Sequence, residues 1–104
     1  MSKYKNRKLK SPDGQMFDSV KEYHRYGCLR ILERAGQIKD LQRQVKFELI
    51  PKQKGMRACY YVADFTYYED GQFVVEDCKG YKTEVFRLKE KLMMWVHGIR
   101  IKIT

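Results

Sequence analysis

The chain has 104 residues, of which 43% are hydrophobic, and its 22 Lys and Arg against 13 Asp and Glu give a formal net charge of +9. This length and apolar content indicate one small folded domain and exclude a disordered chain. No stretch approaches the roughly 20 apolar residues of a membrane span, and no apolar segment follows the charged start, so we expect neither membrane insertion nor secretion.

The first 13 residues are predicted to be a basic arm, and residues 14–104 a single domain. The arm carries five Lys and Arg before the turn at 11–14. A helix is predicted to begin at Ser19, because Ser19 followed by Glu22 forms a capping-box pattern. It is predicted to end at Gly36. An approximate apolar stripe runs along it through Val20, Tyr23, Gly27, Ile31 and Leu32.

Three strands are predicted to follow. Residues 41–50 alternate between apolar and polar side chains up to Pro51, and a basic loop covers residues 52–57. Residues 60–68 and 73–75 are rich in strand formers. The Asp70-Gly71 pair between them is a strong hairpin signal.

A second helix is predicted to begin after Thr83, a typical N-cap residue, and to end at Gly98. Its apolar residues recur at helical spacing at positions 85, 88, 92, 95 and 96. Ile99, Ile101 and Ile103 alternate with polar residues as a last strand. The prediction is therefore an α/β fold in the order αβββαβ, a mixed sheet flanked by helices.

The charge is unevenly distributed along the chain. Residues 1–57 hold 15 basic and 6 acidic side chains, whereas residues 58–104 hold 7 of each. The basic half favours a nucleic-acid partner, although solvated surface lysines would give the same count. Between Ala58 and Cys78 there are five acids and no base, which indicates a cation site. We identify as candidate phosphate contacts the arm lysines together with Lys52, Lys54, Arg57 and Lys82.

The hairpin places two acids opposite each other. If Asp70-Gly71 is a two-residue turn, Glu69 pairs with Gln72 and the same register sets Asp64 opposite Asp77. Like charges at facing positions cost stability unless a partner compensates them, and a divalent cation would do so. Lys79 projects from the same face, because side chains alternate with period two.

Two carboxylates and a lysine are the groups that metal-assisted phosphodiester hydrolysis needs. The alternative is a solvated hairpin end, with a weak surface salt bridge between Lys79 and either acid. Glu22 has a similar alternative, because at the third helical position its side chain can simply cap the helix. Gln44, Tyr81 and Lys82 are further polar residues near the expected site, each with a weak signal alone.

The segments Val62-Ala63-Asp64-Phe65 and Val74-Val75-Glu76-Asp77-Cys78-Lys79-Gly80 resemble the signature of the PD-(D/E)XK nuclease superfamily. The predicted element order also resembles the common core of that superfamily, the restriction-endonuclease-like fold. In detail the chain is similar to an uncharacterised family of small phage and prophage proteins assigned to it. It is also similar to phage endonuclease-I type junction resolvases and to transposon end-cleaving subunits.

This resemblance implies roles for individual residues. Asp64 and Asp77 would bind the metal, Cys78 would add its backbone carbonyl, and Lys79 would be the catalytic lysine. Glu22 would be the helix-borne acid that contacts the metal or its water. The implied cofactor is Mg²⁺, with Mn²⁺ as a substitute.

We therefore predict a metal-dependent DNA endonuclease, phage or prophage encoded, that acts in the bacterial host cytoplasm, with branched DNA among its expected substrates. A homodimer with two active sites is expected by analogy. The rival hypothesis is a DNA-binding module that keeps the fold without the chemistry. The three cysteines, Cys28, Cys59 and Cys78, have no CxxC pair, so neither a disulfide framework nor a zinc knuckle is indicated, and a reducing cytoplasm fits.

Overall fold

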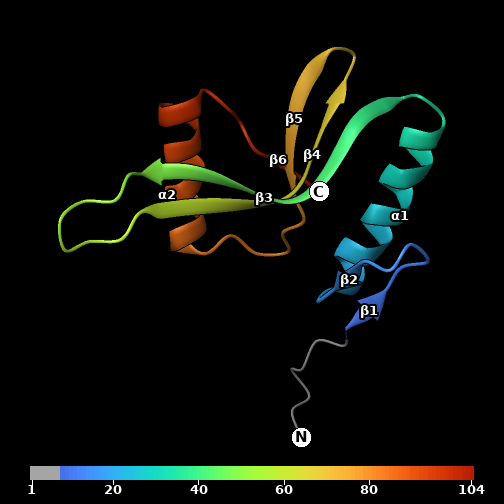
Figure 1. Cartoon of the computed structure of the whole chain (residues 1–104), viewed down its shortest axis with the longest axis horizontal. Coiled ribbons are helices and arrows are strands. Elements are labelled where there is room, and N and C mark those ends of the chain that lie inside the picture. The colour runs from blue at the N-terminus through green and yellow to red at the C-terminus, as the bar shows by residue number, and fades with distance from the viewer. Residues whose placement is uncertain (1–7) are drawn as a thin grey trace, which may run out of the picture.

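The computed structural model describes residues 8–104; residues 1–7, which include most of the predicted basic arm, lie outside the described residues. The elements in chain order are β1 (Leu9–Lys10), β2 (Met16–Phe17), α1 (Val20–Arg34), β3 (Ile38–Ile50), β4 (Cys59–Glu69), β5 (Gln72–Asp77), α2 (Glu84–Leu92), the π-helical turn η1 (Met93–His97) and β6 (Lys102–Ile103). The described residues thus form a mixed α/β fold, and from α1 onward their order is αβββαβ, as predicted (Figure 1).

The strands form two sheets. β1 and β2 make a small antiparallel hairpin that was not predicted. The larger sheet has the order β3-β4-β5-β6, with antiparallel pairs up to β5 and β6 parallel to β5.

Within residues 8–104, no helix has the length and apolar character needed to cross a membrane.

The helix ends follow from local sequence. The Ser19 side chain accepts a hydrogen bond from the backbone N–H of Glu22. At the other end, Gly36 adopts φ +81° while Gln37 donates its backbone N–H to the carbonyl of Leu32. That left-handed position suits glycine, because a Cβ there would be strained. Thr83 caps α2 by accepting from Phe86, and Gly98 ends η1 at φ +68°.

The hairpin register is confirmed. Residues 69 and 72 pair across the Asp70-Gly71 turn, and each further pair keeps the same register up to Phe65 opposite Glu76. Asp70 and Gly71 have φ of +52° and +76°, the left-handed backbone that a two-residue hairpin turn needs and that Asp and Gly tolerate.

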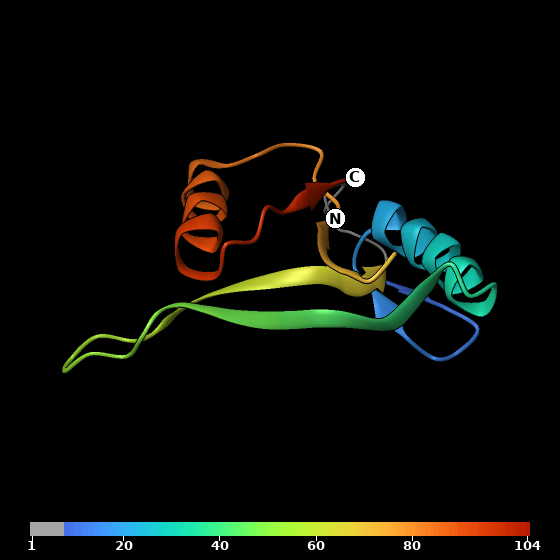
Figure 2. The ribbon, with the colours of Figure 1, turned by 90° about the horizontal axis from the view of Figure 1, so that it is seen from above.

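The long β3–β4 ribbon carries both helices, at different places along its length (Figures 1 and 2). Around α1 the buried residues are Phe17, Tyr26, Leu29, Ile38, Phe65 and Tyr67. Around α2 they are Leu49, Tyr61, Ala63, Val75, Phe86, Met93 and Ile101. The core therefore consists of two clusters. β4 connects them, because Ala63 belongs to the cluster around α2 and Phe65 to the cluster around α1.

The predicted apolar stripes of the two helices correspond only partly to their buried faces. In α1, Tyr26 and Leu29 are buried, whereas Val20 and Ile31 are exposed. The second helix buries Phe86 and Met93. Its stripe residues Val85, Leu88, Trp95 and Val96 are exposed, Trp95 by 83%. Apolar side chains occur on two sides of this helix, so periodicity alone does not select the side that contacts the sheet.

The last strand is shorter than predicted. Of residues 99–103 only Lys102 and Ile103 form β6, although Ile101 is buried as its spacing suggested. After the left-handed Gly98, the chain pairs with β5 only from Lys102 onward. Two parallel pairs form there, with Glu76 and Asp77.

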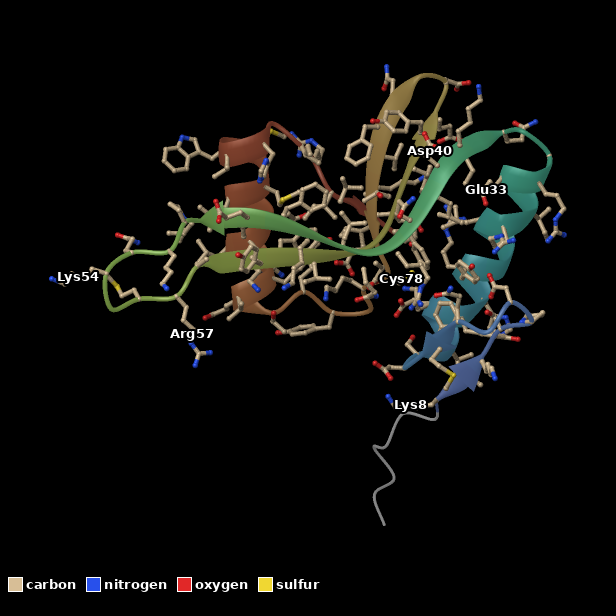
Figure 3. The ribbon with its side chains drawn as sticks, in the orientation of Figure 1. Lys8, Glu33, Asp40, Lys54, Arg57 and Cys78 are labelled. Carbon is tan, nitrogen blue, oxygen red and sulfur yellow. The ribbon has the colours of Figure 1, made fainter. Side chains whose placement is uncertain are left out.

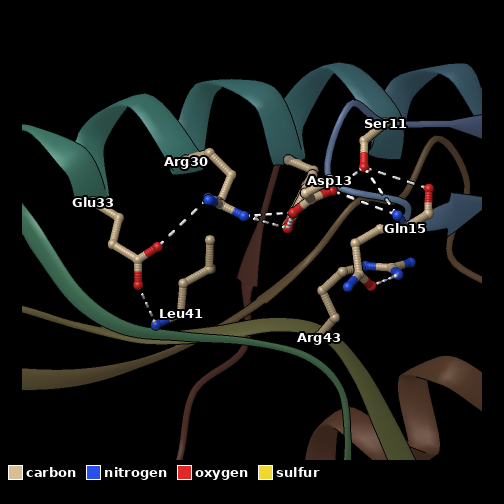
Figure 4. Close-up of polar contacts among 8 residues, drawn as sticks. Ser11, Asp13, Gln15, Arg30, Glu33, Leu41 and Arg43 are labelled. Atoms are coloured by element: carbon tan, nitrogen blue, oxygen red, sulfur yellow. Dashed lines mark hydrogen bonds and ion pairs between the residues drawn. The ribbon is translucent and has the colours of Figure 1, made fainter.

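Residues 8–13, assigned to the arm, contact α1. Asp13 accepts hydrogen bonds from Tyr26 and Arg30, and Arg30 also lies 3.7 Å from Glu33. Glu33 in turn accepts from the backbone N–H of Leu41 at the start of β3 (Figure 4). This chain of polar contacts links the N-terminal hairpin, α1 and β3, and so holds α1 on the sheet.

Candidate active site

The predicted acid pair lies where three strands run side by side. The β3–β4 register places Gln44 opposite Asp64, between the Arg43–Phe65 and Val45–Ala63 pairs. The β4–β5 register, continued by one residue, places Asp77 on the other side of Asp64. Gln44 has φ +54°, a backbone conformation that few residues other than glycine adopt and that is frequent at functional sites. One row across the sheet thus contains Gln44, Asp64 and Asp77.

Asp64 is a partly buried carboxylate with a negative neighbour. Its Oδ2 accepts a hydrogen bond of 2.9 Å from the backbone N–H of Cys78. Burial raises the pKa of Asp64 to about 6, and the charge of Asp77 acts in the same direction, against the Cys78 hydrogen bond and the charge of Lys79. Holding an ionised Asp64 next to Asp77 at neutral pH therefore lowers the stability of the folded state.

Asp77 is almost fully buried, at 3% exposed, and is held from two sides. Tyr61 donates its hydroxyl to Oδ2 at 2.6 Å. Burial and this hydrogen bond raise the pKa of Tyr61, which keeps the phenol protonated and able to donate. The ammonium of Lys79 lies 3.8 Å from Oδ1. Tyr61 thus orients the carboxylate while Oδ1 faces the lysine.

Lys79 and Cys78 continue the strand beyond Asp77. The Lys79 ammonium also lies 4.7 Å from the ring centroid of Phe86, a cation–π contact that holds it over the start of α2. The Cys78 thiol is directed away and contacts the Thr104 hydroxyl at 3.5 Å, and burial raises its pKa. Cys78 lies near the middle of the molecule, between the two helices (Figure 3).

Glu22 contacts the sheet rather than capping its own helix. Its Oε2 accepts from Arg43 at 3.2 Å and from Gln44 at 3.1 Å. Of the predicted capping box, the hydrogen bond from the Glu22 backbone N–H to Ser19 forms. The Glu22 side chain instead turns toward β3. Burial raises the pKa of Glu22, and the charge of Asp64 adds to this effect. The structure thus brings Glu22 to the edge of the acid pair through Gln44.

A second polar cluster surrounds one buried carboxylate, that of Glu76, and it was not predicted. Glu76 is fully buried and accepts from the Arg25 guanidinium at 2.6 and 3.0 Å. It also accepts from the hydroxyls of Tyr67 and Thr104. Arg25 lies one helical turn after Glu22, so i, i+3 spacing is the signal that relates the two residues. This cluster ties α1 to β5 directly behind Asp77.

A metal ion at this site would require side-chain ligands that converge on one point. Among residues 8–104, no three His, Cys, Asp or Glu side chains converge as ready ligands. Two carboxylates do: Asp64 and Asp77, each with one oxygen occupied by a neutral or backbone donor. Mg²⁺ commonly takes one or two protein carboxylates and keeps several waters, so this pair fits a magnesium ion in donor type and number.

The predicted phosphate contacts are separated in space. Lys52, Lys54 and Arg57 lie on the exposed loop that joins β3 to β4, at the far end of the ribbon (Figure 3). Lys82 lies before α2, where its ammonium pairs with Glu90 at 3.1 Å. The lysines at positions 3 and 5 lie outside the described residues.

No curated protein matches the chain significantly, and neither does any solved structure. One family model matches residues 1–102, described as a protein of unknown function (DUF1064). A match over nearly the whole chain establishes membership, and this protein belongs to the DUF1064 family.

Proposed function

We propose that this protein is a metal-dependent DNA endonuclease with a restriction-endonuclease-like core of the PD-(D/E)XK type. The observation that carries the proposal is the Asp64–Asp77 pair on adjacent strands, next to the ammonium of Lys79. Two carboxylates at facing positions repel each other, and burial increases that cost. A protein that keeps such a pair beside a lysine has the groups for phosphodiester hydrolysis.

Asp64 and Asp77 are the proposed ligands of Mg²⁺ or Mn²⁺, both of which prefer carboxylate oxygens. By resemblance, the Cys78 carbonyl and Glu22 are further ligands, directly or through water. When bound, such an ion polarises the phosphate and lowers the pKa of an attacking water.

The residues of the chain itself have three tasks in this proposal. Tyr61 and the Cys78 N–H each hold one carboxylate oxygen, so that the remaining oxygens keep a set orientation. Lys79 offers positive charge next to Asp77, where it would stabilise negative charge on the phosphate. Phe86 limits the positions of the Lys79 side chain.

A second candidate function is a DNA-binding module without chemistry. Two observations favour it: the described residues lack a three-ligand cluster, and Arg43 with Gln44 already binds the Glu22 carboxylate. The acid pair separates the two candidates. A binding module loses nothing when one carboxylate is neutralised, because DNA is itself negatively charged.

The test is a cleavage assay with the purified protein on a four-way junction, a matched linear duplex and a single strand. Each substrate is incubated with Mg²⁺, Mn²⁺ or EDTA. The variants are Asp77→Asn and Lys79→Ala, and Asp70→Asn is the control, because it removes a carboxylate from the turn of the same hairpin where Asn tolerates φ +52°.

We expect metal-dependent cutting that falls by about 100-fold or more in both site variants and stays unchanged in the control. DNA affinity should persist in Asp77→Asn. Tight binding without cutting under any metal would instead support the binding module. The substrate that is cut would also show whether branched DNA is preferred.

A further inference from the structure

The segment that joins β3 to β4 is exposed, and we call residues 50–59 the arm here, as distinct from the predicted N-terminal arm. Gln53 and Met56 exchange two backbone hydrogen bonds of 2.9 and 3.1 Å, which close a tight turn at Lys54-Gly55. Gly55 takes φ +76° there, as such a turn requires. The arm projects past α2 and away from the rest of the chain (Figures 1 and 2).

The arm is purely basic. From Leu49 to Ala63 the charged residues are Lys52, Lys54 and Arg57. All three are exposed, and within residues 8–104 none of them forms an ion pair. Lys54 points outward from the end of the loop, and Arg57 points outward from the segment that leads into β4 (Figure 3). An acid-free tip with unpaired cations is complementary to phosphates.

β4 leads from this tip to Asp64. Tyr60 and Val62 stand at even positions of β4 and so share one face of the strand. Tyr60 and Val62 are each 40% exposed, and the Lys46 ammonium lies 5.0 Å from the Tyr60 ring centroid. At about 3.3 Å per residue, the nine steps from Gly55 to Asp64 span roughly 30 Å. That length equals about nine base pairs at roughly 3.4 Å each.

We infer that this arm lies in the major groove of duplex DNA, about one helical turn away from the phosphate at the acid pair. The arm consists of two antiparallel chain segments, paired at Ile50–Cys59 and bridged at Gln53–Met56, and the major groove of B-DNA, about 12 Å wide, admits two such segments. Lys52 before the turn, Lys54 within it and Arg57 after it would contact phosphates along the groove. Met56, 60% exposed at the tip, faces the base edges. This inference rests on the proposed function and adds the substrate class: duplex on at least one side of the cut.

The test compares two triple variants that remove equal charge. K52Q/K54Q/R57Q neutralises the arm, and R87Q/K89Q/K91Q neutralises three basic residues of α2, which within residues 8–104 also form no ion pair. Binding to a labelled duplex and to a single strand is measured by fluorescence anisotropy over a salt series. EDTA prevents cutting, so binding is read without catalysis.

We expect the arm variant to bind duplex about 10-fold or more weakly, with a log–log salt slope reduced by about 3. The α2 variant should lose much less affinity for the duplex. The two variants should differ less in their affinity for the single strand. A photo-crosslinker at position 56 should label the duplex, whereas one at the exposed position 95 should not.

Equal losses in both triple variants, or no crosslink from position 56, would overturn the arm inference while wild-type cleavage leaves the proposed function standing. A wild type that neither binds nor cuts any DNA would overturn both. Equal losses on duplex and single strand would exclude groove binding, because a groove exists only in the duplex.

Discussion

Glu76 and Asp77 are neighbours in the sequence, yet their carboxylates lie in opposite electrostatic surroundings. Glu76 faces α1 and is fully buried, with its charge matched by Arg25 and its oxygens satisfied by Tyr67 and Thr104. Its pKa is lowered, because these partners outweigh the effect of burial. Asp77 faces the other way, toward Asp64, a second negative charge.

This difference distinguishes Glu76, whose charge is neutralised within the fold, from the acid pair, for which we propose a function. The first has every lone pair occupied and a guanidinium partner, so it contributes to a unique fold. In the acid pair the pKa of Asp64 is about 6, and its neighbour Asp77 adds a second negative charge, which is the arrangement on which our proposal of a cation site rests. The four predictions below test this contrast.

The largest effect is expected from Glu76→Ala. The substitution leaves the Arg25 guanidinium, whose side chain is 26% exposed, without its partner. Breaking a buried ion pair in this way should lower the free energy of unfolding by about 3 kcal/mol. Urea denaturation measures it, and Glu69→Ala at the hairpin end, expected to change less than about 0.5 kcal/mol, is the control. Equal midpoints for both variants would contradict a structural role for Glu76.

At the acid pair, removing a carboxylate is expected to raise the free energy of unfolding. Asp64→Asn removes one of two repelling charges, and the Asn carbonyl still accepts from the Cys78 N–H. Without metal at pH 8, the variant should be more stable than wild type by about 1–2 kcal/mol. At pH 4 the gain should vanish, because folded wild type is then protonated at Asp64. A destabilised variant at pH 8 would show that the pair is structural.

The pH dependence follows from the same carboxylate. The folded pKa of Asp64 is about 6 and its ordinary value is 3.8, so between these values the folded state binds more protons than the unfolded state. The contribution of Asp64 to the free energy of unfolding should therefore fall as pH rises from about 4 to 6. Excess MgCl₂ should raise the melting temperature more at pH 8 than at pH 5, because binding at pH 5 must displace a proton. Thermal scans with MgCl₂ and EDTA measure both, and a magnesium effect that is unchanged in Asp64→Asn would place the ion elsewhere.

The smallest stability change is expected from Glu22→Gln. Its backbone cap with Ser19 stays, and the Gln carbonyl can still accept from Arg43 and Gln44, so the change should be under about 0.5 kcal/mol. If Glu22 assists the metal or its water, cleavage should nevertheless fall by about 10-fold. Ser19→Ala is the converse control: it should cost about 1 kcal/mol through the lost cap and leave the cleavage rate at saturating DNA unchanged. Cleavage at the wild-type rate in Glu22→Gln would assign Glu22 to holding Arg43 alone.

Much of this site could be predicted because its geometry depends on neighbours in sequence. The Asp70-Gly71 turn sets the register of the hairpin, and the period of two then sets which side chains share a face. Asp64, Asp77 and Lys79 were therefore predictable as one group. The partners Arg25 and Arg43 were not, because each reaches its carboxylate across more than 20 residues of chain. The exposed stripe of the second helix was missed for a similar reason, since apolar residues occur on two of its sides.

By itself, the sequence determined the order of elements from α1 onward, the helix caps, the hairpin turn and its register, all of which arise from contacts within a few residues, but not the β1–β2 hairpin or the short β6. Tertiary structure alone decided which carboxylate would be neutralised by an arginine and which would be left facing another acid. It also decided which side of each helix would be buried and how far the arm at residues 50–59 would extend from the site. These choices depend on the packing of α1 and α2 on different parts of one twisted ribbon, because burial and long-range charge pairing are set by the three-dimensional neighbours of a residue.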